Sequence, residues 1–210
     1  MRFFEGMDNK VFLDLASDIL LGDKMLCPGR MANLIHYAMQ VNSLPGDMVE
    51  FGCYTGRTAA LLALVTGRPL WLYDSFEGLP IQKPQDEGGC FGAGDFVAKE
   101  EQVYEWFAKF DLPKPNVYKG WFNAIPAENI PPKISFAYLD GDRYESTLDS
   151  LRLVYPRLGR GGVCLIDDYG WAGCPGTKIA VYEFMADKPE NVMVLSVLNP
   201  DAAQAVIIKI

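Results

Sequence analysis

Short apolar runs alternate with amphipathic segments along most of this chain. Strand-like runs are predicted at 48–51, 70–73, 116–119, 134–139, 161–166, 192–197 and 205–210. Between them, apolar residues recur at helical spacing and predict helices at 58–65, 96–110, 144–154 and 177–185. Because a strand, a helix and a further strand form a parallel crossover unit, the pattern predicts an α/β fold with a doubly wound, mostly parallel sheet of about seven strands.

The two ends of the chain add helices and a hairpin to this pattern. Residues 1–45 predict two helices whose apolar faces carry Val11, Phe12, Leu15 and Ile19 in the first, and Met31, Leu34, Ile35, Ala38 and Met39 in the second. The turn sequence Asn199-Pro200-Asp201 predicts a hairpin that places one antiparallel strand at the C-terminal end of the sheet. The segment Ser75–Asp95 is rich in Gly, Pro and Gln and longer than a connection requires, so it is a candidate ligand-covering loop.

Composition narrows the class of protein. A chain of 210 residues with 50% hydrophobic residues and a mean hydropathy of +0.04 predicts one domain over 1–210, with a helical segment at 1–45 and an α/β core at 46–210. A net charge of −8 without clustered Lys and Arg disfavours nucleic acid as a partner. No signal peptide and no membrane-spanning stretch is visible, so a cytoplasmic protein with no membrane partner is expected.

Cysteine and histidine provide little chemistry in this sequence. The five cysteines are odd in number and contain no C-x-x-C pair, so neither a disulfide framework nor a zinc site is indicated. The one histidine, His36, lies on the predicted polar face of a helix, and imidazole is therefore not expected to act as a general base.

Two acidic clusters each follow a strand-like run. Asp140 and Asp142 follow 134–139, whereas Asp167 and Asp168 follow 161–166. The helix predicted at 144–154 makes these two strands parallel, so their carboxyl ends lie side by side, at the edge where open α/β sheets bind ligands. A single Asp at such a place can simply cap a helix or start a turn. Four converging carboxylates repel one another unless a cation or a proton lies among them, and together they predict a metal site.

A glycine-containing turn follows the first predicted strand. The sequence from Glu50 to Gly56 lacks the G-x-G-x-x-G spacing of the dinucleotide fingerprint, and its acidic residue would repel a pyrophosphate. An acidic residue there suits a cationic ligand, such as the amino-acid end of S-adenosylmethionine. Asp74, at the end of the second strand, is then placed to accept hydrogen bonds from ribose hydroxyls.

Longer motifs give these signals a family. The chain resembles the macrocin O-methyltransferases in 49–52, 73–80, 119–122, 139–147 and 166–170, and the resemblance runs from about Asn33 to Phe184. The most specific motifs are D-S-F-E-G-L-P at 74–80 and D-G-D-x-Y-E-S-T at 140–147. Those enzymes methylate sugar hydroxyls in macrolide and aminocoumarin antibiotic pathways. The chain departs from the family at Thr55, Arg57 and 173–181, on the cofactor loop and the acceptor side.

The resemblance implies a site and a chemistry. It implies S-adenosylmethionine as cofactor and Mg²⁺ held by Asp140, Asp167 and Asp168, with Asp142 as the base. The residues expected to contact the cofactor are Glu50, Gly52, Cys53, Tyr54, Thr55, Gly56, Thr58, Asp74, Ser75, Phe76, Gly120, Trp121 and Asp140. The expected partners are a small-molecule acceptor with hydroxyl groups and a second copy of the chain in a homodimer.

Two other functions are compatible with the residues. Asp140-Gly141-Asp142 also fits the D-x-D metal motif of glycosyltransferases, and an S-adenosylmethionine-binding domain without catalysis would keep the same cofactor residues. The sequence does not identify the acceptor. Trp121, Tyr169 and Trp171 are candidates for its pocket, although aromatic residues near a sheet edge are as often part of the core.

Overall fold

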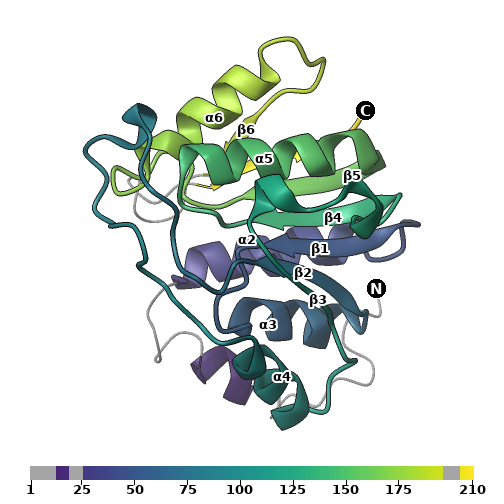
Figure 1. Ribbon diagram of the computed structural model, residues 1–210. Coiled ribbons are helices and arrows are strands. Elements are labelled where there is room, and N and C mark those ends of the chain that lie inside the picture. The colour runs from purple at the N-terminus through teal and green to yellow at the C-terminus, as the bar shows by residue number, and fades with distance from the viewer. Residues whose placement is uncertain (1–12, 19–25, 196–203) are drawn as a thin grey trace.

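A seven-stranded sheet forms the centre of the structure, a computed structural model that describes residues 13–18, 26–195 and 204–210 (Figure 1). The strands follow the order β3-β2-β1-β4-β5-β7-β6. β7 pairs antiparallel with β5 and β6, and the other pairs are parallel. The predicted doubly wound sheet with one antiparallel C-terminal strand is therefore confirmed. The strands are β1 (Asp47–Phe51), β2 (Leu70–Asp74), β3 (Asn116–Lys119), β4 (Ile134–Leu139), β5 (Leu158–Ile166), β6 (Met193–Leu195) and β7 (Gln204–Ile208).

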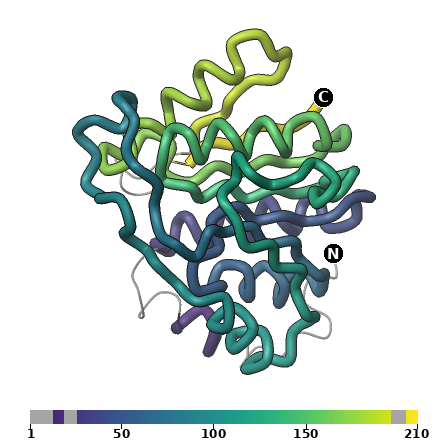
Figure 2. The backbone as a smooth tube through the Cα atoms, viewed as in Figure 1, coloured from purple at the N-terminus to yellow at the C-terminus, as the bar shows by residue number. Residues whose placement is uncertain are grey.

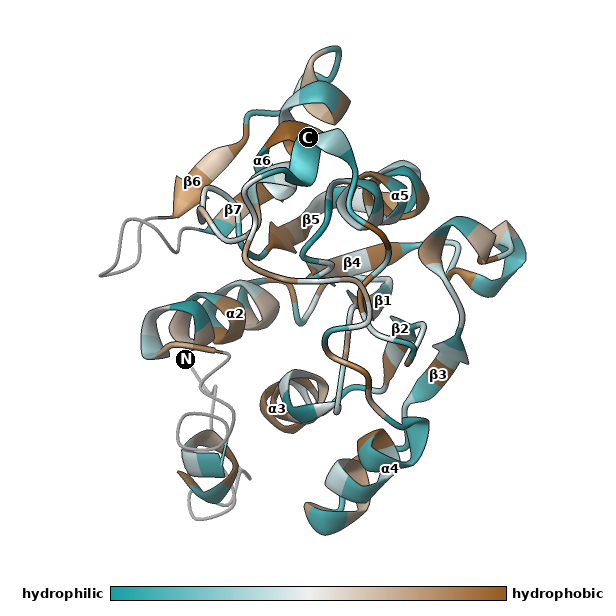
Figure 3. Ribbon diagram, turned by 60° about the vertical axis from the view of Figure 1, so that its left-hand side comes forward, coloured by the Kyte–Doolittle hydropathy of each residue, from teal (hydrophilic) through white to brown (hydrophobic). Residues whose placement is uncertain are grey.

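Helices cover both faces of this sheet (Figure 3). One face packs against α2 (Pro28–Gln40), α3 (Arg57–Thr66) and α4 (Glu100–Lys109), and the other packs against α5 (Tyr144–Val154) and α6 (Pro175–Met185). Successive strand residues alternate between the two faces, so Met48 of β1 belongs to the first core and Val49 to the second. Burial on both faces explains why the central strands are apolar throughout. The short 3₁₀ helices are η1 (Pro84–Asp86), η2 (Phe122–Ala124), η3 (Ala127–Asn129) and η4 (Tyr155–Arg157).

Some predicted boundaries are wrong. The helix predicted at 96–110 begins only at Glu100, because Phe96 has a φ of +65° and the Lys99 N–H is capped by Oε1 of Gln102 at 2.9 Å. β5 begins at Leu158, ahead of the predicted 161–166. Residues 13–18 are helical, as predicted, but Val11, Phe12, Ile19 and the turn at 199–201 lie outside the described residues.

The strand order reverses between β1 and β4. From β1 the chain continues to β2 and β3 on one side, and β4 starts the other half of the sheet. Main-chain hydrogen bonds continue past the strand ends: Asp140 N–H donates to the Phe51 carbonyl at 2.9 Å, and Asp167 N–H donates to the Leu139 carbonyl at 2.8 Å. The carboxyl ends of β1, β4 and β5 therefore lie next to one another at a topological switch point, where α/β sheets bind ligands.

The segment 75–95 leaves this edge and runs to the start of α6, along the left-hand side of the tube in Figure 2. The Cys90 N–H donates to the Gly173 carbonyl at 3.1 Å, which attaches the segment beside α6. None of the helices among the described residues is long and apolar enough to cross a membrane.

Candidate active site

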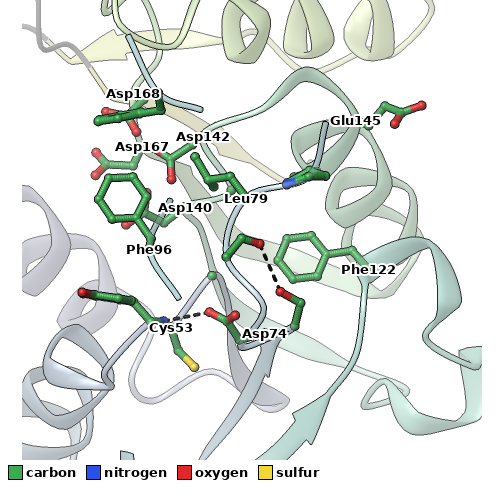
Figure 4. Close-up of a pocket in the computed structure, with 18 of the residues that line it drawn as sticks. Cys53, Asp74, Leu79, Phe96, Phe122, Asp140, Asp142, Glu145, Asp167 and Asp168 are labelled. Atoms are coloured by element: carbon green, nitrogen blue, oxygen red, sulfur yellow. Dashed lines mark hydrogen bonds between the residues drawn. The ribbon is translucent and has the colours of Figure 1, made fainter. Parts of the chain in front are cut away.

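A cavity of about 660 Å³ lies at the carboxyl ends of β1, β2, β4 and β5. Its walls come from 26–30, 52–58, 74–96, 121–123, 140–149 and 167–171, which are far apart in sequence. This volume is in the range of small-molecule sites, which is roughly 300–1,000 Å³. The glycine turn and Asp74 lie on one side of the cavity and the acidic clusters on another (Figure 4).

Gly52 lets the turn after β1 touch the end of β4. Its φ is +87°, and a Cβ at this position would lie 1.8 Å from the carbonyl oxygen of Asp140. Only glycine fits so close an approach of two backbones. The residues from this turn and the start of α3 that line the cavity are Gly52, Cys53, Tyr54, Thr55, Arg57 and Thr58.

Asp74 connects this turn to the turn after β2. Its carboxylate accepts the N–H of Tyr54 and the N–H of Phe76, each at 2.8 Å. Burial raises the pKa of Asp74, and the backbone hydrogen bonds oppose that shift. The next residue, Ser75, also lines the cavity and donates from Oγ to the Gly78 carbonyl at 3.2 Å. Asp74 itself lines the cavity, so a ligand hydroxyl there could reach its carboxylate.

Four of the predicted cofactor residues do not line the cavity: Glu50, Gly56, Phe76 and Gly120. Gly56 precedes α3 with a φ of +86° and packs against Val103. Phe76 is buried in the core, and Gly120 donates its N–H to the Asp74 carbonyl at 2.8 Å. These two residues shape the site through Asp74.

Glu50 is fully buried and does not line the cavity. Neither carboxyl oxygen has a hydrogen-bond partner among the described residues, and burial, followed by the charge of Asp74, raises its pKa well above the usual value. In the sheet it pairs with Tyr138, so both side chains point to the face covered by α2 and α3. A neutral carboxyl group is the form that such an environment favours.

The predicted acidic residues converge at the other side of the cavity. Carboxylate oxygens of Asp140, Asp167 and Asp168 lie within 4.8 Å of one another, and a second group within the same distance consists of Asp142, Asp168 and the thiol of Cys174. Burial, followed by the charge of Asp167, raises the pKa of Asp140 well above its usual value. For Asp167, burial and the charge of Asp168 raise the pKa to about 6.

This donor set fits a hard divalent cation. Asp167 Oδ1 is buried and has no hydrogen-bond partner among the described residues, so it has a lone pair to offer. Carboxylate oxygens of Asp140, Asp167 and Asp168 lie within 4.8 Å of one another, close enough for all three residues to hold one cation. A cation there would also relieve the repulsion that raises their pKa values.

Asp142 lies beside this group in an unusual backbone conformation. Its φ is +58°, and its Oδ1 accepts a hydrogen bond from the Cys174 thiol at 3.4 Å. Burial, followed by the charge of Asp168, raises the pKa of Asp142 well above its usual value. A carboxylate with a raised pKa is a stronger base than an ordinary Asp.

Arg30, which the sequence analysis did not single out, also reaches this cluster. Its Nη1 donates to Asp168 Oδ1 at 2.7 Å and to Asp167 Oδ2 at 3.0 Å, and the Tyr138 hydroxyl donates to the same Asp167 oxygen at 2.8 Å. Burial disfavours its charge, but the two carboxylates outweigh that effect and raise the pKa of Arg30. One sequence signal was available, since Arg30 lies four residues before Leu34 on the buried face of α2.

The segment 75–95 is attached to the rest of the site by buried groups. Asp86 accepts the Tyr144 N–H at the start of α5 through Oδ1 at 2.8 Å and the Lys83 N–H through Oδ2 at 3.0 Å. Arg143 is also buried and donates to the Phe91 carbonyl at 2.6 Å. The segment thus covers the cavity while it is anchored next to the acidic cluster.

Aromatic residues form much of the remaining wall. Trp121 and Trp171 line the cavity, as do Phe91, Phe96 and Phe122, and Leu79 lies between Phe122 and the acidic cluster in Figure 4. Tyr169 does not line it and packs instead against the core beside α6. Asn123, Glu145 and Asp149 also line the cavity; Glu145 belongs to the D-G-D-x-Y-E-S-T motif, whereas no motif contains Asn123 or Asp149.

Comparisons with known proteins agree with this geometry. The sequence profile of the family described as macrocin-O-methyltransferase (TylF) matches residues 13–194. The demethyldecarbamoylnovobiocin O-methyltransferase of Streptomyces niveus is 34% identical over 165 residues, which are 69% of this chain and 60% of that protein. The 8-demethyl-8-(2,3-dimethoxy-alpha-L-rhamnosyl)-tetracenomycin-C 4'-O-methyltransferase of Streptomyces olivaceus is 32% identical over 162 residues, 68% of this chain and 59% of that protein.

A solved structure, that of the O-methyltransferase NovP, superposes with a TM-score of 0.73 at 26% identity and covers 96% of this chain and 99% of its own. The two curated relatives are longer, and their alignments with this chain span about three fifths of their length, 60% and 59%. Because the profile matches most of the chain and the relatives exceed 30% identity, the chain belongs to the macrocin-O-methyltransferase family.

Proposed function

We propose that the chain transfers a methyl group from S-adenosylmethionine to a hydroxyl group of a sugar-bearing small molecule, with assistance from Mg²⁺. The observation that carries this proposal is the single cavity that joins the glycine turn and Asp74 to the acidic cluster. The O-methyltransferases to which the chain is related support the reaction type.

The cofactor would lie along the turn after β1. The close approach at Gly52 leaves room above the strand end, and the N-terminus of α3 follows directly. Asp74, which lines the cavity at the end of β2, would accept hydrogen bonds from the ribose hydroxyls. S-adenosylmethionine would supply an electrophilic methyl group, and the short distance between Gly52 and the Asp140 backbone would direct it to the acidic cluster.

The acceptor would lie between the acidic cluster and the aromatic wall. Methyl transfer is an in-line displacement, so the first task of the site is to hold a hydroxyl oxygen in line with the methyl carbon. An ordinary Asp cannot deprotonate an alcohol efficiently. A divalent cation held by Asp140, Asp167 and Asp168 would lower the pKa of that hydroxyl. Asp142, with its raised pKa, would take the proton, and the Cys174 thiol would orient its carboxylate.

The acceptor is best described as a sugar attached to a larger molecule. Aromatic faces such as Trp121 and Trp171 suit the apolar faces of sugar rings. The name of the Streptomyces olivaceus relative places its methylation on a rhamnosyl group. Both observations favour a glycosylated natural product as the acceptor.

Binding of S-adenosylhomocysteine tests the proposal first. Isothermal titration calorimetry should show binding to the unmodified chain and at least about tenfold weaker binding to Asp74→Asn, because a charged hydrogen bond contributes roughly 1.5–3 kcal/mol. Asp187→Asn is the matched control, since Asp187 is exposed beyond α6. Methyl transfer is then measured with demethyldecarbamoylnovobiocin and other glycosides, with and without EDTA.

Three outcomes would contradict parts of this proposal. Heat from a nucleotide sugar but none from S-adenosylhomocysteine would favour a glycosyltransferase. Cofactor binding without transfer to any glycoside would favour a binding domain. Transfer that EDTA leaves unchanged would remove the metal from the mechanism.

A further inference from the structure

Arg30 occupies a place that helix stability does not explain. It lies in the first turn of α2, directly after Pro28 and Gly29, where the positive end of the helix dipole disfavours a cation. Its side chain is also buried, with only 8% of its surface exposed, which adds a desolvation cost. Its ion pairs with Asp167 and Asp168 help to offset both costs.

Those contacts satisfy only part of the acidic cluster. Arg30 Nη1 bonds to Asp168 Oδ1 and Asp167 Oδ2, but Asp167 Oδ1 has no hydrogen-bond partner among the described residues. A carboxylate oxygen of Asp140 lies within 4.8 Å of oxygens of the same two carboxylates, so a third acid belongs to this cluster. The single positive charge of Arg30 can balance only one of the several carboxylate charges in this cluster. The two carboxylates that Arg30 contacts are both among the three proposed metal ligands.

We propose that Arg30 is the resident counter-ion of this cluster: it holds Asp167 and Asp168 in position and competes with a divalent cation for their charge, so that it sets the metal affinity of the site. The proposal rests on the proposed metal site. Because Leu26 and Cys27 precede Arg30 and line the same cavity, metal binding is thereby coupled to the position of α2.

Binding of Mn²⁺, followed by electron paramagnetic resonance of the free ion, tests this role without any acceptor. Arg30→Gln removes the positive charge beside the ligands, and we expect it to tighten Mn²⁺ binding at least about tenfold. Arg30→Lys keeps the charge, and its affinity should stay within about threefold of the unmodified protein. Arg160→Gln is the matched control, since Arg160 is an exposed arginine near the opposite end of β5.

Thermal unfolding provides the second readout. Without metal, Arg30→Gln leaves two buried carboxylates without their cation, so its melting temperature should fall by about 5–10 °C. Saturating Mn²⁺ should recover most of that loss and raise the melting temperature of Arg30→Gln more than that of the unmodified protein. Opposite changes in metal-free stability and metal affinity are what a competing counter-ion requires.

The outcomes separate this role from the proposed function. No Mn²⁺ binding by the unmodified protein would overturn the metal site and the role of Arg30 together. Metal binding that Arg30→Gln leaves unchanged or weakens would overturn only the competition. If Arg30→Gln does not fold, hydrogen exchange of the unmodified protein decides: Mn²⁺ should speed exchange at residues 31–40 of α2, and slower exchange there would overturn the proposal.

Discussion

Substitution of Gly52 by Ala should separate the effect of backbone conformation from the effect of a close approach. The φ of +87° costs an L-residue roughly 1–2 kcal/mol. The added Cβ would also lie 1.8 Å from the Asp140 carbonyl oxygen, so the turn or the end of β4 must move, at a further cost of roughly 1–3 kcal/mol. We expect a total loss of about 2–5 kcal/mol in the free energy of unfolding.

Gly67→Ala is the matched control for this substitution. Gly67 follows α3 with a φ of +65°, and a Cβ there would meet no atom within 4 Å. It should therefore lose only the conformational part, about 1–2 kcal/mol. Urea unfolding with a constant m-value measures both differences.

Calorimetry with S-adenosylhomocysteine then shows whether the backbone movement caused by Gly52→Ala also changes the cofactor affinity. Affinity should fall in Gly52→Ala and remain unchanged in Gly67→Ala. Equal stability losses in the two variants would refute the argument from the close approach, and an unchanged cofactor affinity in Gly52→Ala would refute its connection to the cofactor turn.

Three further predictions concern the acidic cluster and the covering segment. Asp142→Asn should lower the rate of methyl transfer about 10²-fold or more at unchanged cofactor affinity, because an amide cannot take the proton. A loss of Mn²⁺ affinity as large as in Asp167→Asn would contradict the role of Asp142 as a base that is not a metal ligand. Without metal, the free energy of unfolding should fall by up to about 3 kcal/mol as the pH rises from 4 to 7, because the folded Asp167, with its pKa raised to about 6, keeps a proton that the unfolded chain has already released. Mg²⁺ should oppose this loss increasingly as the pH rises. A melting temperature that rises over this pH range without metal would contradict the argument. Asp86→Ala should speed hydrogen exchange at residues 80–92 more than Asp95→Ala does. Asp86 is buried and hydrogen-bonded to the start of α5, whereas Asp95 is an exposed acceptor within the segment. Equal exchange rates in the two variants would show that Asp86 does not anchor the segment.

Local patterns were sufficient for the elements whose sequence and environment agree. β4 and α5 have the predicted bounds, 134–139 and 144–154, because an apolar run and a helical repeat are each bounded by polar residues. The start of α4 was missed because Phe96 fits the helical spacing, although its backbone is left-handed. Periodicity reports which face a residue takes and carries little information on φ.

The candidate site was predictable where single strand ends define it. Asp74 ends β2, and Asp140 and Asp167 directly follow β4 and β5; the rule for parallel sheets brings such strand ends together. Arg30 was not predictable in this way, because its partners lie 137 and 138 residues away and only tertiary packing selects them. Glu50 is a different case: it precedes the glycine turn, but its fully buried side chain does not line the cavity, so its contact with a cofactor stays a prediction.

The main-chain hydrogen bond between Phe51 and Asp140 joins the two halves of the cavity through the sheet itself. In the proposed reaction, the angle between the cofactor side and the acceptor side would consequently be set by the sheet and would not depend on the segment 75–95. Sequence change at 75–95, or at Trp121 and Trp171, can therefore alter which molecule enters without altering how the reacting groups face each other. Divergence of acceptor preference within such a scaffold then requires no new chemistry, only new loops.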